Sequence, residues 1–248
     1  MNYQLRSFIN RVVNFVRPKP RFIPLTSAQI LKSNEGLDLV ERFNDLFYSS
    51  GVAESLNWRG MPMVKNPCDL WMVIELIQRL RPKIIVETGT HYGGSATFYA
   101  DIAAVLGLHC TVITIDFNPK WSFDPLEKGI ISLIGYSIEP SIIKKVSDII
   151  TKANTYDPGP VMVMLDSDHS EANVSAELQL YSSFVTRGSY LIVEDTNING
   201  HPSFPSHGPG PWEAVEKFLK DNKNFVIDLD CQRYLLTSNP NGWLRRIL

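Results

Sequence analysis

The chain has 248 residues, of which 44% are hydrophobic, 20% charged and 10% aromatic, with a formal net charge of −2 and a pI of about 6.2. This composition is typical of a globular protein with a sizeable core, and it excludes collagen-like, coiled-coil and disordered chains. The near-neutral charge argues against a nucleic-acid partner, while three widely spaced cysteines without a CxxC pair argue for a reducing, cytoplasmic home.

The first 34 residues differ from this average, because they contain basic residues but no Asp or Glu. Apolar residues alternate with the charges at roughly helical spacing, and no uninterrupted apolar stretch of signal-peptide or membrane-span length is present. Two interpretations stay open. Residues 1–20 form either a basic amphipathic helix at the inner face of a membrane, or an arm that packs on the domain or on another subunit of a homo-oligomer.

The segment that follows predicts helices. Apolar residues at helical spacing indicate a helix over 36–49, and Asn66-Pro67 is typical of a helix N-cap followed by proline at the first position. We therefore divide the chain into a basic arm and helix (1–55) and a larger domain (56–248).

From residue 83 onward, short apolar runs alternate with helical patterns. Continuous Val/Ile runs are typical of strands that are covered on both faces, and the alternation predicts a doubly wound, mostly parallel, Rossmann-like α/β sheet. The last two runs predict an antiparallel pair at one edge. The predicted strands are 83–88, 111–116, 131–136, 160–166, 189–195, 225–230 and 233–238, and the predicted helices are 93–108, 140–152, 171–184 and 212–221.

A glycine-rich turn follows the first of these strands, at the sheet edge where such folds bind ligands. Its GxxxGG spacing matches neither the dinucleotide motif nor a P-loop, so it favours a cofactor without phosphate, although a plain chain reversal fits it too. Asp116 ends the next strand and can accept both hydroxyls of a ribose, and Ser137 follows the third. The candidate cofactor residues in the turn are Glu87, Gly89, Thr90, Tyr92, Gly93 and Ser95.

Three acids, Asp166, Glu194 and Asp195, follow two further strands and would repel one another at one edge unless a cation or protons intervene. Their oxygen atoms favour Mg²⁺ over Zn²⁺. Asp168 fits either a metal ligand or a helix cap. His169 stands beside the acids and can act as a general base, or it can be an ordinary exposed or capping histidine.

The Gly- and Pro-rich segment 199–211 is typical of a lid or binding loop. Its two histidines, His201 and His207, are either substrate contacts or ordinary loop residues.

Several segments in this order resemble the cephalosporin hydroxylase and rhamnosyl O-methyltransferase family, over roughly residues 56–220. They are WRGMPMVKNPCDLW, ETGTHYGGSA, LDSDHS, VEDTNING and SHGPGPWEAVEKFL. The resemblance implies a class I methyltransferase dependent on S-adenosylmethionine, in which Glu87, Gly89 and Asp116 hold the methionine and ribose parts of the cofactor. It implies that Asp166, which also borders the cofactor, Glu194 and Asp195 are the metal ligands, and that His169 is the general base.

The function that this resemblance implies is Mg²⁺-dependent methyl transfer to a hydroxyl of a sugar or glycan-type acceptor, with Asp166 and His169 as catalytic residues. A vicinal diol would suit a metal ion, but so would a catechol. Two other classes stay open at this point: an NAD-dependent oxidoreductase, and a non-catalytic scaffold in a biosynthetic complex.

Overall fold

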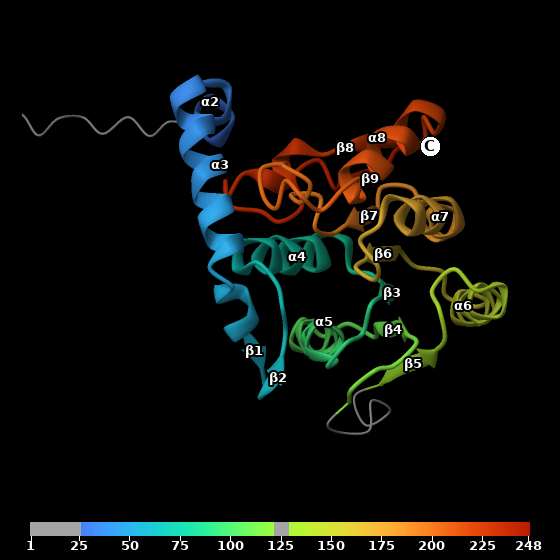
Figure 1. Ribbon diagram of the computed structural model, residues 1–248. Coiled ribbons are helices and arrows are strands. Elements are labelled where there is room, and N and C mark those ends of the chain that lie inside the picture. The colour runs from blue at the N-terminus through green and yellow to red at the C-terminus, as the bar shows by residue number, and fades with distance from the viewer. Residues whose placement is uncertain (1–25, 122–128) are drawn as a thin grey trace, which may run out of the picture.

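A central sheet positions every candidate site residue. The computed structural model describes residues 26–121 and 129–248, and these form a seven-stranded sheet in the order β5-β4-β3-β6-β7-β9-β8 (Figure 1). The strands from β5 to β7 pair in parallel, whereas β9 is antiparallel to both of its neighbours. The strands are β3 (Ile84–Thr88), β4 (Thr111–Asp116), β5 (Ile130–Ile134), β6 (Val161–Leu165), β7 (Tyr190–Val193), β8 (Phe225–Ile227) and β9 (Trp243–Arg246). The predicted fold class is confirmed.

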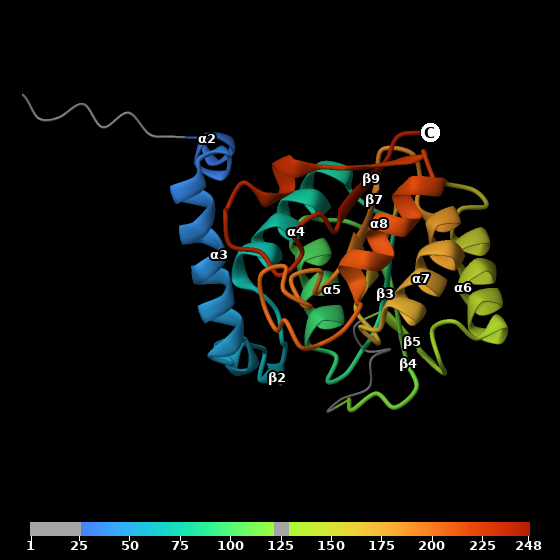
Figure 2. The same cartoon turned by 45° about the horizontal axis from the view of Figure 1, so that its top comes forward.

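Helices cover both faces of the sheet (Figure 2). On one face lie α4 (Pro67–Leu80) and α5 (Gly94–Val105), and on the other lie α6 (Pro140–Ala153), α7 (Glu171–Tyr181) and α8 (Pro211–Asp221). The short helix η3 (Ser182–Phe184) continues α7.

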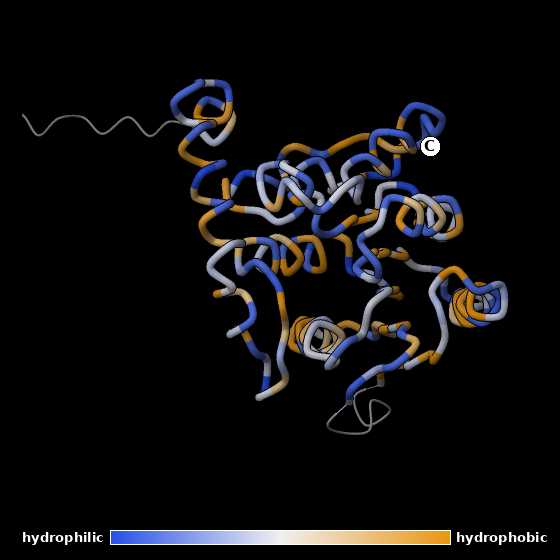
Figure 3. The backbone as a smooth tube through the Cα atoms, in the orientation of Figure 1, coloured by the Kyte–Doolittle hydropathy of each residue, from blue (hydrophilic) through white to orange (hydrophobic). Residues whose placement is uncertain are grey.

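Successive strand residues contact different cores. Ile84 and Val86 belong to the core under α6 to α8, and Ile85 belongs to the core under α4 and α5. Because both cores exclude water, the strands contain continuous hydrophobic runs rather than an alternating pattern. Figure 3 shows these hydrophobic stretches along the middle of the molecule.

The antiparallel edge is present, but the prediction of its second strand is wrong. Residues 233–238 form turns, and the strand that pairs with β8 and β7 is β9, further along the chain. Leu235 has a left-handed backbone (φ 68°), and two N–H groups that follow it bond to side chains: that of Thr237 to Asn44, and that of Ser238 to Asp69. A segment whose N–H groups are satisfied by side chains cannot form a strand ladder. The helix η4 (Leu229–Gln232) precedes these turns.

Two helices stand outside the sheet, α2 (Ser27–Lys32) and α3 (Asn34–Ser49), and η1 (Val52–Ser55) leads from them into the hairpin of β1 (Asn57–Trp58) and β2 (Met61–Pro62). The helix predicted over 36–49 is therefore confirmed. The hypotheses about residues 1–20 lie outside the described residues and stay predictions. No helix in the described part of the chain is long and apolar enough to cross a membrane.

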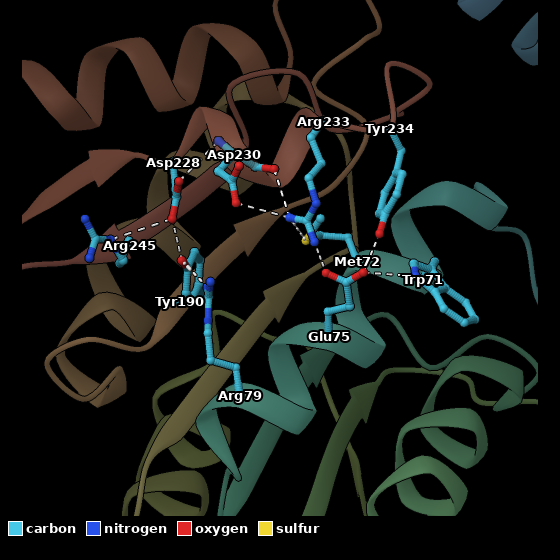
Figure 4. Close-up of polar contacts among 10 residues, drawn as sticks. All are labelled: Trp71, Met72, Glu75, Arg79, Tyr190, Asp228, Asp230, Arg233, Tyr234 and Arg245. Carbon is cyan, nitrogen blue, oxygen red and sulfur yellow. Dashed lines mark hydrogen bonds and ion pairs between the residues drawn. The ribbon is translucent and has the colours of Figure 1, made fainter. Parts of the chain in front are cut away.

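A polar network ties α4 to the C-terminal strands at the amino end of β7 (Figure 4). The Tyr190 hydroxyl accepts a hydrogen bond from Arg79 (2.7 Å) and donates one to Asp228 (2.5 Å). Nearby, Glu75 of α4 forms an ion pair with Arg233. These contacts lie at the opposite end of the sheet from the strand ends that carry the candidate site.

Removal of the Tyr190 hydroxyl should therefore reduce the stability of the fold and leave the candidate site unchanged. Tyr190 is 1% exposed, so Tyr190→Phe leaves the half-buried Asp228 carboxylate and the exposed Arg79 short of a partner, and we expect unfolding to become easier by about 1–2 kcal/mol. Urea denaturation measures the change. Tyr156→Phe, at a side chain 97% exposed, is the control, and equal stability of the two variants would contradict this account.

Candidate active site

The glycine turn between β3 and α5 has a backbone that depends on glycine. Gly89 has φ +87°, and a Cβ there would lie 1.8 Å from the carbonyl oxygen of Asp166. Gly93 (φ +78°) caps α5, and a Cβ there would lie 2.0 Å from the ring of Trp121. Glycine thus lets the ends of β3 and β6 approach closely, and it leaves the first N–H groups of α5 facing the turn.

Two acids flank this turn. Glu87 is fully buried, and its Oε2 accepts from the Thr114 hydroxyl (2.6 Å), while its Oε1 has no hydrogen bond within the described residues. Burial raises the pKa of Glu87 to about 7. An unpaired buried oxygen of this kind is costly, so it marks a place where a ligand donor fits. Asp116 accepts from the backbone N–H groups of His91 and Asn118, each at 2.8 Å, and so holds the turn against β4.

The parallel pairing of β6 and β7 brings the three predicted metal ligands to one edge. Leu165 pairs with Val193, so that Asp166 and Glu194 follow at neighbouring strand ends. Asp195 has a left-handed backbone (φ 54°), which costs about 1–3 kcal/mol in a residue with a Cβ. The Asn239 side chain holds this conformation by accepting the N–H of Asp195 at 3.0 Å.

The positive charge beside these acids belongs to Lys65, which the sequence analysis did not single out. Its ammonium bonds to Asp166 Oδ2 and lies 2.6 Å from Glu194 Oε2, and the residue is only 7% exposed. The segment 58–71 was noted for its family resemblance, but spacing alone cannot show that Lys65 reaches an acid 101 positions away.

His169 lies between two of the acids. Its Nε2 is 3.4 Å from Asp166 Oδ1 and 3.4 Å from Asp195 Oδ2. One donor atom from each of these three residues falls within 4.8 Å of the others, a spacing that a single ion can bridge. The predicted ligand Glu194 lies on the same edge but pairs with Lys65.

The charges perturb one another strongly. Burial would lower the pKa of His169, but Asp195 and Asp166 raise it to about 9. Burial would also raise the pKa of Asp166, but Lys65 and His169 bring it below its ordinary value. Burial raises the pKa of Glu194 to about 8 despite Lys65, because Asp166 adds to the effect. A cluster of this kind is characteristic of a functional site.

The other predicted cofactor residues fall into two groups, those beside the turn and those whose polar atoms are bonded inside the protein. Ser95 is buried in the first turn of α5 beside Glu87, and half-buried Tyr92 carries the Lys120 ammonium 5.3 Å above its ring. The Thr90 hydroxyl is engaged inside the protein, 2.6 Å from that of Thr114. Ser137 is buried, and its carbonyl oxygen accepts from the Tyr181 hydroxyl.

Known proteins resemble this chain over most of its length. The family model described as Rhamnosyl O-methyltransferase/CmcI matches residues 50–247. The rhamnosyl O-methyltransferase of Mycobacterium bovis (strain BCG / Pasteur 1173P2) is 35% identical over 213 residues, covering 84% of this chain and 85% of that protein. That of Mycobacterium leprae (strain TN) is 34% identical over 185 residues, covering 74% and 79%.

The chain belongs to the rhamnosyl O-methyltransferase/CmcI family of S-adenosylmethionine-dependent methyltransferases. A solved CmcI structure with Mg and SAM has a TM-score of 0.58 at 20% identity, covering 79% of this chain and 78% of that one. The fold is therefore shared. The predicted family is confirmed.

In this member of the rhamnosyl O-methyltransferase/CmcI family, Asp168 supports the turn before α7. Its Oδ1 accepts the N–H of Ser170 (2.8 Å), and Ser170 is itself the N-cap of α7. Its carboxylate is thus engaged locally.

The loop 199–211 is held down by Glu213 in the first turn of α8. Its carboxylate accepts from Gly210 N and Asn199 Nδ2, both at 2.8 Å, and lies 3.1 Å from His201 Nε2. The His201 ring also stacks on Trp212, with centroids 4.2 Å apart. His201 is thus part of the loop's own packing. His207 Nδ1 lies 3.1 Å from the carbonyl oxygen of Gly208.

A cavity of about 630 Å³ lies between this loop, the helices α2 and α3, and the turns before β9. Leu31, Val40 and Leu235 give it apolar walls, and Asn44 and His201 give it polar ones. Its described walls do not include Asp166, Glu194 or Asp195 of the candidate metal site.

The carboxylate of Glu213 should make the stability of the loop depend on pH. Burial would raise its pKa, but the hydrogen bonds from Gly210, Asn199 and His201 lower it to about 2 from an ordinary 4.5. A lowered pKa stabilises the fold above pH 4.5, and this stabilisation is lost as the pH falls towards 2. At pH 7 we expect Glu213→Gln to be less stable by about 1–2 kcal/mol, with a smaller difference near pH 3.

Urea denaturation at several pH values measures this difference. Glu216→Gln, at an exposed position of the same helix, is the control. A gap between Glu213→Gln and the wild type that stays constant from pH 7 to pH 3 would rule out the proposed role of the charge.

Proposed function

We propose that this chain transfers a methyl group from S-adenosylmethionine to a hydroxyl of a rhamnosyl or related glycan acceptor, in a Mg²⁺-dependent reaction with His169 as the general base. The observation that carries the proposal is the convergence of Asp166, His169 and Asp195 within 4.8 Å. The names of the curated relatives support a rhamnosyl acceptor.

The cofactor would bind across the ends of β3 and β4. The GxxxGG turn and its close approach to β6 suit a sulfonium compound rather than a pyrophosphate, which favours S-adenosylmethionine over NAD. Glu87 Oε1, which has no hydrogen bond within the described residues, would accept from the cofactor's amino group. Asp116 has lone pairs left beyond its two backbone bonds, and these would accept from a ribose.

The donor atoms suit a hard divalent ion. Asp166, Glu194 and Asp195 would hold Mg²⁺ through carboxylate oxygens, with His169 beside them. The bound ion would lower the pKa of an acceptor hydroxyl, and the cofactor would supply an electrophilic methyl group. Asn239 fixes the backbone of Asp195, which holds this carboxylate in place for the ion.

His169 Nε2 would take the proton of the acceptor hydroxyl. Between two bare carboxylates its pKa is about 9, so it carries a proton at neutral pH. A positive charge shared with Asp166 and Asp195 would remove the cause of that shift and leave Nε2 free to accept a proton.

The metal requirement gives a direct test of this function. We expect EDTA to abolish transfer of labelled methyl groups to a rhamnoside and added Mg²⁺ to restore it. Asp166→Ala should lower kcat by at least about 100-fold, because it removes a metal ligand and the partner of the base.

Asp168→Ala is the matched control, since its carboxylate lies two positions away but bonds to Ser170 N. It should retain activity within a few-fold of the wild type. Full activity in EDTA, or of Asp166→Ala, would overturn the metal role. Absence of any transfer by a chain that binds the cofactor would instead favour a non-catalytic scaffold.

A further inference from the structure

We propose that Lys65 is a built-in counter-cation of the metal site, which neutralises Asp166 and Glu194 while the site lacks metal and weakens the binding of Mg²⁺. The inference rests on the proposed function, because it requires these two acids to be metal ligands.

The position of Lys65 in the fold brings its ammonium to the acids of the candidate metal site. Lys65 lies just before α4 and enters the acidic edge from outside the sheet, and its ammonium touches both Asp166 and Glu194. The approach of its segment depends on Gly94, where a Cβ would lie 2.3 Å from the carbonyl oxygen of Pro62. The fold thus brings this chain segment against α5 closely enough for the lysine to reach the acids.

Lys65 and the two acids that it contacts are largely shielded from water. The side chain of Lys65 is 6% exposed, that of Glu194 10% and that of Asp166 18%. Charges so far from water must be compensated by neighbouring charges. Removal of one partner leaves an uncompensated buried charge and strongly destabilises the fold. Two carboxylates in contact with the Lys65 ammonium favour its charged form.

The charges of the loaded site would balance only if Lys65 is counted with the metal ion. With Mg²⁺ bound, all three acids would be ionised, so Asp166, Glu194 and Asp195 would carry three formal negative charges. A divalent ion would leave one of them uncompensated, and Lys65 supplies the missing positive charge. A neutral loaded site is a better environment for negative charge developing on an acceptor oxygen than a site with an excess of carboxylates. The same ammonium repels an incoming cation, so it weakens metal binding.

We expect loss of the Lys65 charge to lower the stability of the metal-free protein and to raise its affinity for Mg²⁺. Lys65→Met keeps the aliphatic stem but removes the charge. Without metal, the variant should melt at a lower temperature than the wild type, because two buried carboxylates lose their partner. It should also bind Mg²⁺ about tenfold tighter or more, and Mg²⁺ should raise its melting temperature more than that of the wild type.

The experiment uses the full chain stripped with EDTA, titrated with MgCl₂ by calorimetry and melted at several Mg²⁺ concentrations. Lys65→Arg keeps the charge, so its Mg²⁺ affinity should stay within about threefold of the wild type. Lys83→Met is the control for loss of a paired lysine elsewhere, since Lys83 pairs with Asp157 (2.9 Å) at the amino end of β3.

Unchanged or weaker Mg²⁺ binding by Lys65→Met would overturn the inference while leaving the proposed function intact. Loss of S-adenosylhomocysteine binding with unchanged Mg²⁺ affinity would do the same, because Lys65 would then serve the cofactor. Failure of this variant to fold at any Mg²⁺ concentration would also overturn it. Absence of Mg²⁺ binding by the wild type would remove the metal site and this inference together.

Discussion

The arrangement of this molecule depends on negative charge collected where β6 and β7 end. Parallel pairing of these strands places Asp166 and Glu194 side by side, and Asp195 follows directly. Repulsion among these carboxylates is unfavourable, and positive charge on two neighbours offsets it. These neighbours are Lys65 and His169, whose pKa rises to about 9. A group of acids that needs positive charge is also a group that can hold a divalent ion.

Other features serve the approach of segments to this edge. Gly89 lets β3 come close to β6, and Gly94 lets the segment before Lys65 come close to α5. The segment between β8 and β9 does not pair as a strand, and the side chain of its Asn239 holds the left-handed backbone of Asp195. Glu213 pins the loop after β7 to α8. The polar network around Tyr190 lies at the other end of β7 from the candidate site.

The sequence predicted much of this, for local reasons. Strands covered on both faces produce continuous apolar runs, and helix starts such as Asn66-Pro67 carry their own signals, so the order of elements could be predicted. The glycine turn and the acids at strand ends were found because position along a strand fixes the sheet edge. The second edge strand was misplaced, because residues 233–238 have a strand-like composition but bond to Asn44 and Asp69. Lys65 was missed because only the tertiary fold brings it to Asp166.

The central claim is that the glycine turn and the acidic edge together bind a sulfonium cofactor beside a metal ion. Calorimetric titration of the full chain with S-adenosylhomocysteine, with and without Mg²⁺, tests it most directly. We expect saturable binding of one cofactor per chain and a separate Mg²⁺ isotherm that Asp166→Ala abolishes. Binding of NAD in place of S-adenosylhomocysteine, or no cofactor binding at all, would contradict it.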